Sequence, residues 1–175
     1  LLGSMDLNTV KARSGLCTNA AANDCFITVP HAAIRDMSQL GVSPQARRNV
    51  SVFTNDASAP SLASFVSINM QTGTLVVQFN ETVDFSTLFL PSITLQNLFE
   101  PPSQQYLLTG GNYTQLSLTS VQIQLTMFDL ASLKRSRFIC TYRGNCSFVA
   151  SSYLVNDTSG NMFASIPQQE PGLLV

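Results

Sequence analysis

Apolar residues alternate with polar ones over several short segments of the chain, a pattern typical of strands with one buried face. The apolar positions of the three clearest segments are Val66, Ile68 and Met70; Leu75, Val77 and Phe79; and Val121, Ile123, Leu125 and Met127. Shorter apolar segments at 93–95 and 116–118 predict two further strands, and turn residues at 71–73, 101–102 and 110–111 separate the segments. Many short strands at this spacing predict an all-β sandwich.

One helical turn is expected within this pattern. Asp129 stands before the segment 130–134, where its carboxylate can cap free backbone N–H groups, and Asp6 begins a similar segment. Cys140 and Cys146 flank a turn at 142–145. This arrangement predicts a β-hairpin over 138–150 that a disulfide clamps.

An internal repeat organises the chain, and such periods are best found before elements are assigned. Asp6, Leu7, Lys11, Cys17 and Thr18 recur 123 positions later as Asp129, Leu130, Lys134, Cys140 and Thr141. Cys25, Ile34, Asp36 and Ser38 recur 121 positions later as Cys146, Val155, Asp157 and Ser159, and Pro44 and Gln45 return to the first offset as Pro167 and Gln168. The chain therefore holds about one and a half repeats.

The repeat sets the expected domain boundaries. Residues 1–45 form the C-terminal half of one repeat, 46–59 a linker, 60–168 a complete repeat, and 169–175 the start of the next linker. Half a sandwich cannot bury its own apolar face, so we expect residues 1–45 to be completed by strands from a neighbouring repeat or another copy of the chain.

The composition removes several classes of partner. Charged residues make up 11% of the 175 residues, against about 25% in typical soluble domains, and the net charge is −1. This balance provides no basic surface for nucleic acid or anionic lipid. No apolar run is long enough to predict a membrane span in this segment.

Cysteines and glycosylation motifs agree on an oxidising compartment. Four cysteines form two close pairs, and the repeat maps Cys17 and Cys25 onto Cys140 and Cys146, which predicts two local disulfides. Five Asn-x-Ser/Thr motifs predict N-linked glycans at Asn49, Asn80, Asn112, Asn145 and Asn156. Together these features predict an extracellular location, secreted or on the cell surface.

Two segments give the chain a resemblance to a known family. The run 75–88, LVVQFNETVDFSTL, followed by 93–95, resembles the second strand and turn of the bacterial-type immunoglobulin-like repeats of surface-layer and adhesin-like proteins. The segment 155–161, VNDTSGN, resembles the turn before the last strand of those repeats, whereas 36–40 lacks its Gly-Asn pair. The resemblance implies tandem immunoglobulin-like Greek-key β-sandwiches in large extracellular proteins, and it brings no catalytic residues.

The candidates for chemistry are few. His31, the single histidine, lacks a partner that would make it a general base or a metal ligand. Glu81 and Asp84 could hold calcium or act as acid and base, but their position at a strand end favours a turn. Asp157 and its oxygen-bearing neighbours also favour a turn, because they lack the spacing of a calcium loop.

The remaining clusters favour structural roles. Short basic runs at 134–137 and 47–48 are typical of solvated surface. An apolar group around Pro91 and near the end of the chain is expected to pack in the core: Phe85, Phe89, Leu90, Phe99 and Phe163. A surplus beyond one core would mark contacts with a neighbouring domain.

These observations predict a non-catalytic structural module without catalytic residues, metal or cofactor. It would space or assemble an extracellular filament, coat or adhesin, with neighbouring repeats or copies of itself and N-linked glycans as partners. The alternative is a receptor module that binds a glycan or protein through loops at one end of the sandwich, such as 101–105 and 110–113.

Overall fold

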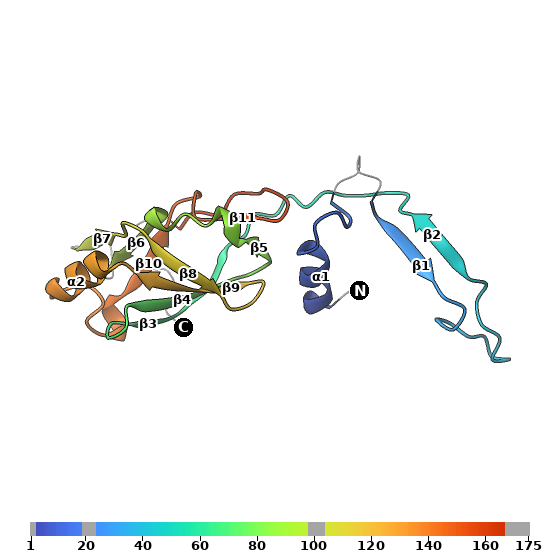
Figure 1. Cartoon of the computed structure of the whole chain (residues 1–175), viewed down its shortest axis with the longest axis horizontal. Helices are drawn as coiled ribbons and strands as arrows, with labels where there is room; N and C mark the ends of the chain where they lie inside the picture. The colour runs from blue at the N-terminus through green and yellow to red at the C-terminus, as the bar shows by residue number, and fades with distance from the viewer. Residues whose placement is uncertain (1–2, 19–23, 98–103, 167–175) are drawn as a thin grey trace. The chain divides into compact units, whose positions relative to one another are not determined.

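The computed structural model describes residues 3–18, 24–97 and 104–166 and divides the chain into two units, Leu1–Asp56 and Ala57–Val175 (Figure 1). The division falls inside the expected linker at 46–59. Most regular structure is β-strand, which confirms the all-β class in its coarse form.

The first unit contains helix α1 (Ser4–Lys11) and a hairpin of strands β1 (Phe26–Val29) and β2 (Gln45–Asn49). We expected residues 46–49 to be linker, so this strand is a difference from the prediction. It forms because β1 offers unpaired backbone groups and because the guanidinium of Arg47 lies 4.6 Å from the centre of the Phe26 ring. A register shift between Ile27 and Val29 accommodates the unusual backbone of Arg47, whose φ is 48°.

The second unit begins with a four-stranded antiparallel sheet in the order β3-β4-β9-β8. Its strands are β3 (Leu62–Asn69), β4 (Thr74–Phe79), β8 (Gly111–Gln115) and β9 (Ser120–Leu125). Burial alternates along β4 and β9 as the sequence predicts, because every second side chain points into the core. The strand expected at 116–118 is instead a turn, in which the N–H groups of Leu116 and Ser117 donate to Ser120 O.

A bulge changes the expected core face of β3. The sequence pattern placed Val66 inside with Ile68 and Met70, but Val66 is exposed and Phe65 is fully buried. The register against β4 shifts between Phe65 and Ser67, so the side chains change face at that point. Ile68 and Met70 still pack against the core as partly buried residues.

A second antiparallel sheet has the order β10-β6-β7, and a short pair joins β11 to β5. These strands are β5 (Val83–Asp84), β6 (Ile93–Gln96), β7 (Gln105–Leu107), β10 (Ser147–Ala150) and β11 (Asn156–Asp157). Three short 3-10 helices, Phe85–Thr87, Leu90–Ser92 and Arg143–Asn145, lie between them. The hairpin expected over 138–150 is wrong, because β10 pairs with β6 and its preceding loop contains a 3-10 turn.

The two sheets share one hydrophobic core. The Phe65 ring of β3 lies 5.6 Å from the Phe148 ring of β10, and Phe79 contacts Phe163 edge-on with ring centres 6.0 Å apart. Of the apolar group around Pro91, Phe85, Leu90 and Phe163 are buried and Phe89 is half exposed. Phe99 lies outside the described residues.

Helix α2 (Met127–Arg135) covers part of this unit. Its N-cap is Thr126, whose Oγ1 accepts a hydrogen bond from the backbone N–H of Asp129. We expected Asp129 itself to be the cap, and Asp6 likewise in α1, where the N-cap is Gly3. Asp129 is instead turned inward and fully buried, because other residues of the unit supply donors for its carboxylate.

Candidate interaction surface

The internal repeat is present in the structure as the same turn built twice. In the first unit the Asp36 carboxylate accepts hydrogen bonds from the N–H groups of Ser38 and Leu40, at 2.9 and 2.8 Å. In the second unit the Asp157 carboxylate accepts from Ser159 and Asn161, at 2.9 and 2.7 Å.

Their backbone bonds also match. Asp36 N–H donates to Leu40 O as Asp157 N–H donates to Asn161 O, and Gln39 and Gly160 occupy the matching position with φ of 63° and 87°. The Asp157 segment is therefore a structural turn closed by its own side chain.

The disulfide loop is also built twice. Cys17 bonds Cys25 and Cys140 bonds Cys146, and the first cysteine of each pair has a φ of 53°. The hydroxyl and N–H of Thr18 donate to the Asp24 carboxylate, and the hydroxyl bond, the larger cause, lowers the pKa of Asp24.

Asn145 closes the second disulfide loop in place of such a carboxylate. Its Oδ1 accepts from the N–H groups of Thr141 and Tyr142, and its Nδ2 donates to Phe138 O and Thr141 Oγ1.

The two copies of the repeated half differ in how deeply their apolar side chains are buried. Four apolar residues of the first unit, Val10, Leu16, Ile27 and Ile34, occupy the positions of Leu133, Ile139, Phe148 and Val155 in the second. All four residues of the second unit are at most 2% exposed. In the first unit Ile27 and Ile34 are 62% and 66% exposed, and Val10 and Leu16 are only half-buried.

We call Val10, Leu16, Ile27 and Ile34 the uncovered core positions. None of the residues described before Pro60 is buried. Exposed apolar side chains such as Ile27 and Ile34, in a unit whose described residues form no buried core, are typical of a surface that another polypeptide covers. This surface is the strongest candidate for function in the chain.

A buried carboxylate was missed by the sequence analysis. Asp129 Oδ1 accepts from the Tyr106 hydroxyl and the Thr109 hydroxyl, each at 2.9 Å, and the Thr109 N–H also donates to the carboxylate. Burial raises the pKa of Tyr106, and the negative charge of Asp129 beside the hydroxyl adds to the increase. No spacing rule links these residues, which lie on different elements and meet only in the fold.

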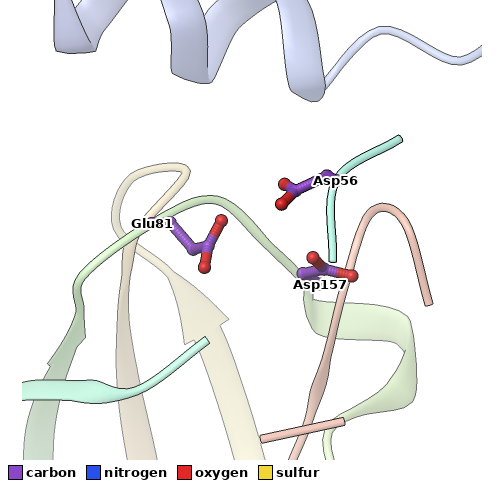
Figure 2. A group of neighbouring side chains, drawn as sticks. All are labelled: Asp56, Glu81 and Asp157. Atoms are coloured by element: carbon purple, nitrogen blue, oxygen red, sulfur yellow. The ribbon is translucent and has the colours of Figure 1, made fainter. Parts of the chain in front are cut away.

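An acidic pair also forms through the fold. Figure 2 shows Glu81 and Asp157, which are both buried and have carboxylate oxygens within 4.8 Å of each other. Asp56, also drawn there, is the last residue of the first unit, where its carboxylate lies 2.6 Å from Lys11 Nζ. In the sequence Glu81 stands nearest to Asp84, where a turn was the favoured expectation. The structure has that turn, because the Asp84 carboxylate accepts from the N–H and hydroxyl of Ser86.

The remaining candidates differ in their exposure to solvent. His31 is exposed, and its Nδ1 lies 3.0 Å from Val42 O beside Gly41. Of the five glycosylation motifs, Asn49, Asn80 and Asn112 are exposed, whereas Asn145 and Asn156 are half-buried. In the alternative binding loops, residues 101–103 lie outside the described part, and 111–113 belong to strand β8.

No helix in the described part of the chain is long and apolar enough to cross a membrane. Among the described residues of the second unit, the buried acidic side chains are those of Glu81, Asp129 and Asp157.

No protein-family model and no curated protein matches the chain. Two solved structures are similar to part of it, both at 16% identity over 63% of the chain. They are the N-terminal part of the bacterial S-layer protein SbsC, with a TM-score of 0.42, and domains 1–6 of surface layer protein SbsC, with a TM-score of 0.43. The matches cover 22% and 13% of those two chains. At TM-scores this low, the likeness carries no argument about function.

Proposed function

We propose that this chain is a non-catalytic repeat module of an extracellular assembly, built from immunoglobulin-like Greek-key sandwiches in tandem. Its task is to space and join neighbouring modules in a filament, coat or adhesin. The proposal rests on the chain's own architecture, in which one design is repeated.

The observation that carries the proposal is the duplicated local structure. The Asp36 and Asp157 turns share their hydrogen bonds, and the two disulfide loops share their backbone conformation. Tandem units of one design stack into extended arrays, where each unit contacts its neighbours.

The order of strands supports the Greek-key part of the proposal. The chain passes from β4 of the first sheet to β6 of the second, returns from β7 to β8, and crosses again from β9 to β10. Such crossings between two antiparallel sheets are typical of immunoglobulin-like sandwiches. The shared core of the two sheets is consistent with this arrangement.

The extracellular part of the proposal is supported by surface chemistry. Two disulfides persist where the environment is oxidising, and the low charge leaves hydroxyl and amide groups to solvate the surface. Three of the five glycosylation motifs have exposed asparagines, which are compatible with attached glycans.

Electron microscopy of native material with an antibody against this chain tests the proposal. We expect label on an extracellular layer or fibre, at a spacing that recurs along it. Label confined to the cell interior would contradict the proposal. Saturable binding of the purified monomer on an array of immobilised glycans, without periodic label, would favour the receptor alternative.

A further inference from the structure

We propose that the first unit is completed by a polypeptide segment of the same type as residues 57–123, the part of the second unit that precedes its own copy of the repeated half. This inference names the partner of the module proposed above. The second unit contains such a segment, packed against the elements that match those of the first unit.

Residues at matched positions of the two units differ in burial. Phe148 is fully buried because it packs against Phe65 of β3, with ring centres 5.6 Å apart. Ile27 is the matching residue of the first unit, and it is 62% exposed. The side chain that Ile27 lacks is therefore one from a strand equivalent to β3.

Strand β1 pairs with β2 along one edge, and in the described residues no strand pairs with its other edge. Backbone groups along a strand alternate between its two edges. Val50 N–H donates to Cys25 O on the side of β2, so the backbone groups of Phe26 and Thr28 lie at the opposite edge.

The second unit shows which strand pairs with the corresponding edge of β10. There, Ile166 N–H donates to Ala150 O at one edge of β10, and Ser151 N–H donates to Ser92 O at the other, beside β6. Because Ala150 matches Val29, which pairs with β2, the β2 edge corresponds to the Ile166 edge. The free edge of β1 thus corresponds to the edge that β6 occupies, and β2 does not block it.

The two units also differ at a matched carboxylate position. Asp129 is buried and accepts hydrogen bonds from Tyr106 and Thr109, which both belong to the segment 57–123. Asp6 matches Asp129 and is exposed. The same segment type that covers Ile27 would therefore also bring a tyrosine and a threonine to Asp6.

Repeat spacing gives a direct experiment with the full chain. Because residue 124 corresponds to residue 1, a second copy of residues 57–123 joined directly before Leu1 places the added strands in register. The matched control carries the same extension with Leu75→Asp and Val77→Asp in the added copy only, since both side chains point into the core of the second unit.

Amide hydrogen exchange of β1 is the measurement. With the added segment, the Phe26 and Thr28 amides should exchange at least about 100-fold more slowly than with the control extension, and a new cooperative melting transition should appear. Ile27→Asp should weaken that new transition but leave the chain without an extension unchanged, whereas Ser14→Asp, at an exposed position, should affect neither.

Equal exchange of these amides with both extensions, or the lack of a new transition, would overturn the proposal. Concentration-dependent protection of the same amides in the chain without an extension would show that a whole second copy covers this edge without any free segment of the 57–123 type, and the proposal would be wrong. All these results are independent of where the protein lies in the cell, so they can fail while the extracellular role stands.

Discussion

Tyr106 and Asp129 show how one residue's surroundings set its chemistry. The carboxylate of Asp129 is fully buried, which is costly unless donors surround it, and Tyr106 and Thr109 provide them. Asp6 has the same sequence position in the repeat but lies at the surface. An aspartate at the same position of the repeat is therefore exposed in one unit and is the centre of a polar network in the other.

Because of Tyr106, we expect the second unit to lose stability at alkaline pH. Burial raises its pKa above the ordinary value of 10.0, so its contribution is full below that pH and is lost as the pH rises through the folded-state pKa. The melting temperature of the second unit should fall over this range in the wild type. Tyr106→Phe should be less stable at neutral pH by about 1 kcal/mol and should show a weaker alkaline decline. An unchanged decline in this variant, followed by circular dichroism, would contradict the assignment.

We expect the glycosylation motifs to differ in how often they carry a glycan, because the Asn145 side chain is bonded inside a loop. Its Nδ2, the atom that carries a glycan, donates to Phe138 O and Thr141 Oγ1 inside the disulfide loop. Asn112 is exposed on strand β8. In a secreting eukaryotic host, we expect glycan at Asn112 and Asn80 and an unmodified Asn145. Peptide mass spectrometry checks this, and high occupancy at Asn145 would show that the loop closes only after the glycan is attached.

At the scale of the element, the duplicated turn gives a matched pair of substitutions. Gly160 has a φ of 87°, where a Cβ is unfavourable, so Gly160→Ala should destabilise the second unit by about 1 kcal/mol. Gln39 holds the same position with a φ of 63°, so Gln39→Gly should relieve the strain there. Urea unfolding measures the first effect, and exchange of the Leu40 amide measures the second. Opposite signs are expected, and effects of the same sign would contradict the equivalence of the turns.

The two disulfides give a second test at the scale of the element. We expect non-reducing peptide mapping to find Cys17 with Cys25 and Cys140 with Cys146. Replacing Cys140 and Cys146 together by serine should destabilise the second unit by roughly 2 kcal/mol, because the bridge closes only a short loop. The same change at Cys17 and Cys25 should leave the melting of the second unit unaltered. A bridge between the two units would refute this pairing.

At the scale of the whole molecule, the two units should differ in cooperativity. The second unit has a shared core and should melt in one transition, whereas the first has no buried residue in its described part. Phe79→Ala should lower the stability of the second unit by roughly 3–5 kcal/mol, since Phe79 contacts both Phe85 and Phe163. Ile27→Ala should leave that transition in place. Calorimetry separates these outcomes, and equal effects of both variants would contradict the two-unit description.

Much of the local structure followed from the sequence because local rules act between near neighbours. The alternation in β4 and β9 predicted their buried faces, and the turns at Asp84 and Asp157 followed from side chains that bond their own backbone. The failures involve partners far along the chain. The hairpin predicted over 138–150 was wrong because β10 pairs with β6, which is distant in the sequence. Val66 changed face because a bulge depends on the paired strand.

The internal repeat could be found from the sequence alone, since matching residues at fixed offsets predict matching turns and loops. The sequence also led to the expectation that the first half-repeat needs a cover. Tertiary structure alone decided which of the matched side chains are buried and which are exposed. It buried Asp129 among donors, placed Glu81 beside Asp157, and left Ile27 exposed while it buried Phe148. The reason is physical: burial and hydrogen bonding depend on what lies opposite in space, and spacing along one chain does not encode that partner.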